Sequence, residues 1–171
     1  RDGDILLHND MEKITFVVPV YNPDLKYFGM CLESLAHQTY SNYDVILVND
    51  GSTNGAEVLC SDYAEKNDNF TVINRENKGV SAARNAGISY ISGSKWITFI
   101  DSDDRIREDS VEFLTEYLKE KEEDIIFFGS VKCDGNSESV HCPLSYEESE
   151  SLGVEEKREI LLDLIAEGFH L

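Results

Sequence analysis

The sequence lacks any apolar run of 18 residues, so no transmembrane helix is expected within it. The beginning of the sequence also lacks the apolar core of a signal peptide. Met11 stands just before the first strongly apolar segment, and residues 1–12 are therefore interpreted as a leader or other extension. No internal repeat is visible, and the 171 residues fit one globular domain followed by a short additional region.

Positive charge is scarce. The chain has 15 Lys+Arg against 34 Asp+Glu, which gives a net charge of −19. Residues 1–100 carry 8 positive and 13 negative side chains, 8 − 13 = −5, and residues 101–171 carry 7 and 21, 7 − 21 = −14. Without a basic stripe to neutralise phosphates, nucleic-acid binding is disfavoured. An anionic substrate would need a few local Lys or Arg side chains or a metal ion, whereas solubility alone explains most of the acidity.

The four cysteines show no C-x-x-C spacing. Cys31 and Cys60 fall in expected helices and are interpreted as reduced packing residues. Cys133 and Cys142 could face each other across a hairpin turning at residues 134–136, and His141 lies beside Cys142. Two or three such ligands without a second pair are weak support for zinc, so neither a metal nor a disulfide is expected there.

Apolar periodicity alternates between strand and helix along the chain. Such alternation predicts an α/β fold, a mostly parallel sheet with helices on both faces, as in Rossmann-like nucleotide-binding domains. The expected strands are Ile14–Val20, Val45–Val48, Phe70–Ile73, Trp96–Ile100 and Ile125–Phe128. The expected helices are Leu25–Ala36, Ala56–Tyr63, Val80–Ile91 with Gly93 as its C-cap, Val111–Leu118 and Val154–Ala166.

Polar clusters follow the carboxyl ends of three of these strands, where ligands bind in open parallel sheets. One cluster contains Asp101 and Asp103; if the strand continued through them, both carboxylates would project to the same face. Two carboxylates are half of a site for Mg²⁺ or Mn²⁺, which takes oxygen ligands and substrate phosphates. The alternative is a turn and cap cluster, with Asp103 or Asp104 starting the next helix.

The second cluster, LVNDGST at 47–53, places Asp50 at a strand tip, where its carboxylate could accept N–H groups from a base. Here too a structural alternative stays open, because Asp-Gly is a turn signal and Ser52 or Thr53 could cap the next helix. The segment KGVSAARNAGI at 78–88 contains two cations, Lys78 and Arg84. The start of its helix could favour an anion.

Four motifs occur in a fixed order: VPVYN at 18–22, VNDGS at 48–52, KGVSAARNAGI at 78–88 and FIDSDD at 99–104. In this order and spacing they resemble the nucleotide-sugar half of family-two glycosyltransferases, which have the GT-A fold. The resemblance covers about Lys13–Phe128, and residues 13–130 are accordingly interpreted as a donor-binding domain. Asn54 departs from the family, which usually has Asp there, at a peripheral position.

The resemblance implies roles for individual residues. The implied nucleotide-binding residues are Pro19, Tyr21, Asn22, Asp50, Lys78, Arg84, Asp101 and Ser102. Tyr21 would stack on the base beside a pocket wall shaped by Pro19, and Asp50 would contact the base edge, most often of uracil. Arg84, near Lys78, would hold the nucleotide. Asp101 would lie near the ribose and sugar, and Asp103 would bind Mn²⁺ or Mg²⁺ at the diphosphate.

The implied reaction is metal-assisted sugar transfer from a nucleoside diphosphate to a hydroxyl acceptor, with inversion. It needs a general base in the acceptor half, and no residue here matches one; Glu155, Glu156 and Glu159 are interpreted as a solvated helix face. Residues 131–171 are interpreted as a hairpin, an acidic loop and a helix at the start of a truncated acceptor half. The chain is thus expected to bind the donor without efficient turnover.

The acceptor stays open between a saccharide, a lipid-linked sugar and a protein. The resemblance favours polysaccharide assembly in the cytoplasm, at the inner face of the membrane if other parts of the protein reach it. Three alternatives remain open. In a phosphatase of the haloacid-dehalogenase type, Thr or Val would stand at the position of Arg105. A dinucleotide-binding domain would carry G-x-G-x-x-G where this chain has YNPDLK. A non-catalytic binding or assembly module with the transferase fold is the third.

Overall fold

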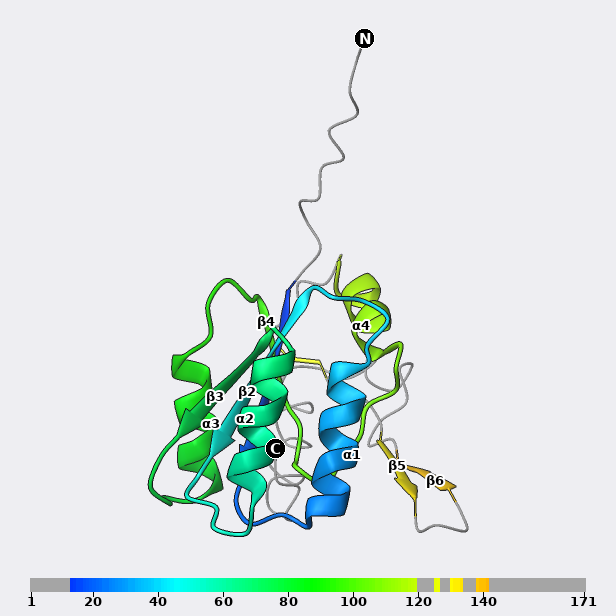
Figure 1. Cartoon of the computed structure of the whole chain (residues 1–171). Helices are drawn as coiled ribbons and strands as arrows, with labels where there is room; N and C mark the ends of the chain where they lie inside the picture. Colours follow the sequence, from blue (N-terminus) through cyan, green and yellow to red (C-terminus); the bar gives the residue numbers. More distant parts are fainter. Residues whose placement is uncertain (1–12, 120–124, 127–129, 134–137, 142–171) are drawn as a thin grey trace, which may run out of the picture. The chain divides into compact units, whose positions relative to one another are not determined.

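A computed structural model describes residues 13–119, 125–126, 130–133 and 138–141 (Figure 1). The chain divides into two compact units, Arg1–Lys121 and Glu122–Leu171. The described elements of the first unit are, in chain order, β1 (Ile14–Val20), α1 (Leu25–Ala36), β2 (Tyr43–Asn49), α2 (Ala56–Lys66), β3 (Phe70–Asn74), α3 (Val80–Ser89), β4 (Trp96–Phe99) and α4 (Ser110–Leu118). Strand and helix alternate as the sequence predicts.

The four strands of the first unit form one parallel sheet in the order β3-β2-β1-β4. All seven residues of β1 are buried, as expected for a central strand covered on both faces. Pro19 is tolerated in this strand because pairing with β4 ends at Val17, where Val17 lies opposite Phe99. The backbone nitrogen of Pro19 points to the β4 side of β1, past the last residue that pairs with β4. The missing N–H of Pro19 therefore removes no hydrogen bond between the paired residues of these two strands.

Helices lie on both faces of this sheet because the chain reverses direction within it. From β1 to β3 the chain moves outward strand by strand, and it then returns across β2 and β1 to form β4. Since parallel crossovers are right-handed, α1 and α2 lie on one face and α3 lies on the other. Figure 1 shows α1 and α2 running side by side. The α3 face of the core contains Val17, Ile46, Val48 and Ala83. The predicted α/β architecture is confirmed.

The structure corrects two expected boundaries. Helix α3 ends at Ser89, with Tyr90 as its cap, so Ile91 lies outside the helix and Gly93 is not the C-cap. Gly93 instead adopts a positive φ of 75° in the following turn. Ile125 and Ile126 are not in a strand, and the rest of the expected strand lies outside the described residues, as does the expected helix 154–166.

The described part of the second unit is an antiparallel hairpin of β5 (Ser130–Cys133) and β6 (Glu138–His141). The hairpin was expected, but in its register Cys133 lies opposite Glu138 rather than Cys142, which falls outside the described residues.

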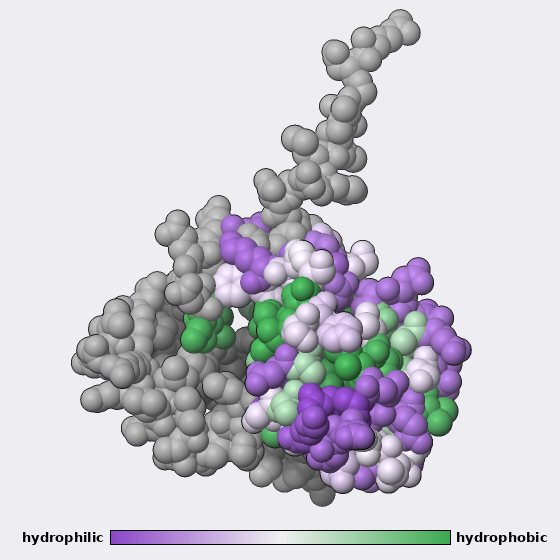
Figure 2. Space-filling view, turned by 90° about the vertical axis from the view of Figure 1, so that its left-hand side faces the viewer, coloured by the Kyte–Doolittle hydropathy of each residue, from purple (hydrophilic) through white to green (hydrophobic). Residues whose placement is uncertain are grey.

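In the part of the chain that the structure describes, no helix is both long and apolar enough to cross a membrane. On the face of the first unit in Figure 2, hydrophilic residues surround an apolar area.

Candidate functional site

Three sequence motifs meet at the carboxyl edge of the sheet. Tyr21 follows β1, Asp50 follows β2 and Asp101 follows β4 shortly after its last residue. The strand order reverses between β1 and β4, and such a switch point is where open α/β sheets bind ligands. The topology therefore gathers polar groups at one edge, as the sequence predicts.

The loop after β1 is held by the loop after β2. The Asn22 N–H donates to Ser52 Oγ at 3.1 Å, and the Thr53 N–H donates to Asn22 Oδ1 at 2.8 Å. Asn22 has a φ of 46°, in a left-handed conformation that Asn adopts more readily than most residues. Tyr21, beside it, is 56% exposed, so its ring is available to a ligand. Pro19 is buried within β1.

Neither Ser52 nor Thr53 caps the following helix, contrary to one alternative from the sequence. Gly55 occupies the N-cap position of α2, with a φ of 98° and no side-chain cap bond. Ser52 is instead buried, and its own N–H donates to Asn49 Oδ1 at 3.0 Å. These residues therefore shape the loops around the site rather than the start of the helix.

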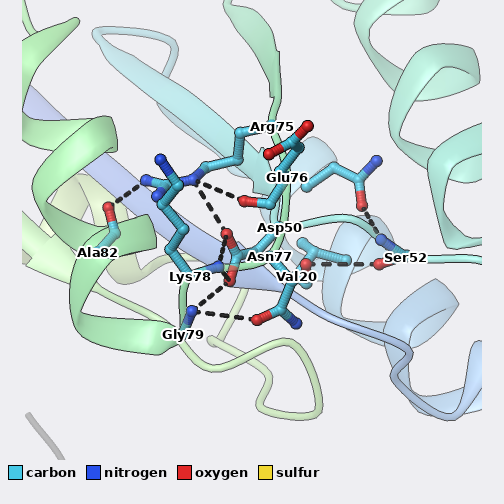
Figure 3. Close-up of polar contacts among 10 residues, drawn as sticks. Val20, Asp50, Ser52, Arg75, Glu76, Asn77, Lys78, Gly79 and Ala82 are labelled. Atoms are coloured by element: carbon cyan, nitrogen blue, oxygen red, sulfur yellow. Dashed lines mark hydrogen bonds and ion pairs between the residues drawn. The ribbon is translucent and has the colours of Figure 1, made fainter.

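Asp50 is the most enclosed charged group of the site, with the residue only 2% exposed (Figure 3). Its carboxylate accepts the backbone N–H groups of Lys78, at 3.1 and 3.2 Å, and of Gly79, at 2.8 Å. Arg75 Nε lies 3.0 Å from Asp50 Oδ1. Arg75 Nη1 also donates to the Ala82 carbonyl, at the start of α3. The contact of Lys78 with Asp50 is thus made by its backbone, and the side chain of Lys78 is exposed.

Sequence reasoning missed Arg75. A signal existed in the strand register: Asn49 and Asn74 are the last paired residues of β2 and β3, so Asp50 and Arg75 are neighbours just beyond them. The two loops also approach closely. A Cβ added to Gly51, which has a φ of 79°, would lie 3.0 Å from the Asn77 backbone nitrogen. Glycine is therefore required there on both counts.

Arg84 and Asp101, both predicted as site residues, form an ion pair. Arg84 Nη2 lies 3.0 Å from Asp101 Oδ1, with side-chain exposures of 11% and 45%. The guanidinium also stands over the Phe99 ring at 5.5 Å, and its Nε is buried without a hydrogen-bond partner in the protein. Helix α3 thus carries a cation to the acidic end of β4. That cation offsets part of the repulsion among the carboxylates there.

The acidic segment is a turn, not a continuation of the strand. Strand β4 ends at Phe99, and the Asp104 N–H donates to the Asp101 carbonyl at 2.9 Å. The expectation that Asp101 and Asp103 share one face of an extended strand is therefore wrong. Neither Asp103 nor Asp104 starts the next helix, because α4 begins at Ser110 after Asp109. The turn supplies a geometry in which several carboxylates crowd together near Ser102, which is half-buried.

Crowding of carboxylates in this turn raises the pKa of nearby groups. Partial burial raises the pKa of Asp104, and the Asp101 and Asp103 carboxylates raise it further. Cys31, on α1, donates its thiol to the Asp101 carbonyl at 3.7 Å. Burial, with the same carboxylates, raises the pKa of Cys31 to about 12. Cys31 and Cys60 are both buried free thiols, as predicted.

The carboxylate oxygens of this turn are suitable ligands for a hard divalent cation. Carboxylate oxygens are the ligands that Mg²⁺ and Mn²⁺ prefer, and a cation would relieve the repulsion that raises the Asp104 pKa. Among the described residues no group of three His, Cys, Asp or Glu side chains could hold a metal ion. Mg²⁺ sites commonly use one or two carboxylates together with substrate phosphates.

The fold and the arrangement of the strand-end loops together define an α/β domain of the GT-A type. Residues 15–166 match the model of the family described as "Glycosyl transferase family 2", and the chain belongs to this family. The glycosyltransferase GlyA of Streptococcus pneumoniae serotype 4 (strain ATCC BAA-334 / TIGR4) is 44% identical over 114 residues, which are 67% of this chain. GlyG, a glycosyltransferase of the same strain, is 39% identical over 129 residues, or 73% of this chain.

Among solved structures, residues 1–349 of TarS from S. aureus in complex with UDP-GlcNAc superpose with a TM-score of 0.58 and 28% identity. The match covers 63% of this chain and 31% of that one. The chain spans only 16% of the length of GlyA and 42% of that of GlyG. The GT-A fold and the family are therefore shown, and the resemblance read from the four motifs is confirmed.

Proposed function

We propose that this chain binds a nucleoside-diphosphate sugar, with UDP as the nucleotide, at the carboxyl edge of its sheet. The proposal extends to metal-assisted, inverting transfer of a hexose from this donor to a hydroxyl acceptor. The observation that carries it is the Arg84–Asp101 pair, which joins α3 to an acidic turn at the switch point of the sheet. The TarS structure with UDP-GlcNAc, a family relative with this fold, supports the choice of donor.

The nucleobase is assigned to the β1 and β2 side of the edge. Tyr21 offers an exposed ring for stacking. The Asp50 carboxylate is held by Arg75 Nε at Oδ1, by the Gly79 N–H at Oδ2 and by the Lys78 N–H, which both oxygens share. A base N–H would share one of these acceptor oxygens. Uracil offers one N–H, at N3, so Asp50 is a group that could distinguish base edges.

The ribose, diphosphate and metal are assigned to the β4 side. Asp101, which precedes Ser102, pairs with Arg84, whose charge would attract the diphosphate. Asp103 is exposed and would hold Mn²⁺ or Mg²⁺ together with phosphate oxygens. When bound, the cation would stabilise the negative charge that builds on the departing diphosphate. None of the described residues is assigned as the general base that inversion requires.

Calorimetric titration of the 171-residue chain with UDP, in Mn²⁺ and again in EDTA, tests the proposal. We expect binding by the wild type in Mn²⁺, and loss of the Mn²⁺-dependent part of that binding in Asp103→Ala. Asp68→Ala, which removes an exposed carboxylate between α2 and β3, is the matched control and should bind like the wild type. Equal affinities for wild type and Asp103→Ala would refute the metal role.

The identity of the nucleotide is tested by repeating the titration with GDP and dTDP. Binding of GDP but not UDP would show that the base was assigned wrongly while the donor site stands. If no nucleotide binds in either condition, the chain is not a donor-binding domain by itself, and the alternative of a non-catalytic module with the transferase fold would be favoured.

A further inference from the structure

One side chain connects the end of β2 with the start of α3. Arg75, 20% exposed at its side chain, places Nε against Asp50 and Nη1 against the Ala82 carbonyl (Figure 3). A planar guanidinium can make these two contacts at once because its donors point in fixed, diverging directions. A lysine ammonium could keep the charge near Asp50 but would not reproduce both bonds.

We propose that Arg75 is a positioning residue of the nucleotide site: it fixes the Asp50 carboxylate and the first turn of α3 in the arrangement that receives the base. The inference rests on the proposed function and goes beyond it, since Arg75 belongs to none of the four motifs. Arg75 is placed to act through Asp50, because its Nε lies against the Asp50 carboxylate and its Nη1 donates to the Ala82 carbonyl.

The charge of Asp50 makes this role necessary. A carboxylate on a side chain that is 3% exposed needs compensation, and Arg75 is the cationic side chain that contacts it within the described residues. Without Arg75, the two backbone N–H groups from Lys78 and Gly79 would remain, but the ionised carboxylate would lack a counter-charge. The segment 75–79 would then move relative to β2, and the Asp50 carboxylate would lose the orientation in which it faces the base.

Four variants separate positioning from simple stabilisation: Arg75→Met, Arg75→Lys, the double variant Arg75→Met with Asp50→Asn, and the control Arg107→Met. Arg107 is 83% exposed at its side chain and pairs with Asp109 just before α4, so its loss removes a cation without touching the sheet edge. For each variant the dissociation constants of UDP and of uridine would be measured, together with unfolding in urea.

We expect Arg75→Met to raise the dissociation constants of UDP and uridine alike, by about tenfold or more, the range for a hydrogen bond to a charged group. An equal loss for both ligands locates the effect at the nucleoside rather than at the diphosphate, since uridine has no diphosphate. Arg75→Lys should lie between Arg75→Met and the wild type. Arg107→Met should bind like the wild type.

The double variant separates the effect of Arg75 on stability from its effect on uridine binding, which a purely structural role would not do. Asp50→Asn removes the uncompensated buried charge, so it should restore much of the urea stability lost in Arg75→Met. It should not restore uridine binding, because the carboxylate that accepts the base N–H is gone.

Unchanged dissociation constants in Arg75→Met and Arg75→Lys, with lowered stability, would overturn this inference and leave the proposed function intact. Recovery of uridine binding in the double variant would overturn it as well. A wild type that binds neither UDP nor GDP would overturn the proposed function, and the inference with it.

Discussion

Replacing Gly87 by Ala tests how tightly α3 is pressed against the sheet. A Cβ built on Gly87 would lie 2.3 Å from Val17 Cγ1, and 3.3 Å from Val17 Cγ2 and Val48 Cγ2. Val17 is fully buried in the central strand, which pairs with β2 and β4, so it has little room to move. The added methyl group must displace either the helix or a core valine. Such overpacking costs about 1–3 kcal/mol.

A matched substitution separates this cost from the general effect of removing a glycine. Gly29 lies within α1, and a Cβ added there would meet no heavy atom within 4 Å. Gly29→Ala should therefore stabilise the protein by about 0.5–1 kcal/mol through backbone entropy and helix propensity. Because Gly87→Ala makes the same gain, the two variants should differ by the overpacking cost alone. Gly87→Ala should be less stable than Gly29→Ala by about 1–3 kcal/mol.

Urea unfolding followed by the fluorescence of Trp96 measures this difference. Trp96 is the one tryptophan of the chain, and it lies in β4, next to β1. Equal stability of the two variants, or a more stable Gly87→Ala, would refute the close packing of α3. In addition, Val17→Ala should remove the clash, so the double variant with Gly87→Ala should be less destabilised than the sum of the single changes.

Further predictions concern an exposed aromatic ring and the buried thiols. Tyr21→Ala should weaken UDP binding by about 1–3 kcal/mol, the range for stacking on an aromatic side chain, and calorimetry would check it; an equal loss for ribose 5-phosphate, which has no base, would speak against stacking. Burial raises the pKa of the Cys31 thiol and of the Cys60 thiol to about 12. Both should therefore resist iodoacetamide at pH 8 in the native protein and react in urea, as read by mass spectrometry. Above pH ~9 the unfolded chain loses its thiol protons, whereas the folded protein keeps the protons of Cys31 and Cys60. The unfolding free energy should therefore fall by about 1.4 kcal/mol per pH unit for each thiol, up to pH ~12. Replacing Cys31 by Ala should reduce this slope, and an unchanged slope would contradict the assignment.

The sheet was predictable because local sequence carries the information. Seven consecutive apolar or β-branched residues in β1 can form a strand buried on both faces, and small residues in α3 permit close packing on it. Boundaries were less certain where two signals competed. Gly93 resembles a helix cap, but the helix had already ended at Ser89, and the positive φ of Gly93 serves the next turn.

What the sequence by itself determined is the order of strands and helices, the motifs at the strand ends and the family. Periodicity fixes which face of an element is buried, and motif spacing fixes which loops can meet at one edge. Only the tertiary structure decided the partners: Arg75 with Asp50, Arg84 with Asp101, and Cys31 beneath the acidic turn. These contacts join residues 17 to 70 positions apart along the chain. Strand register and helix packing create them, and no local pattern of charge or hydrophobicity specifies which distant group will arrive.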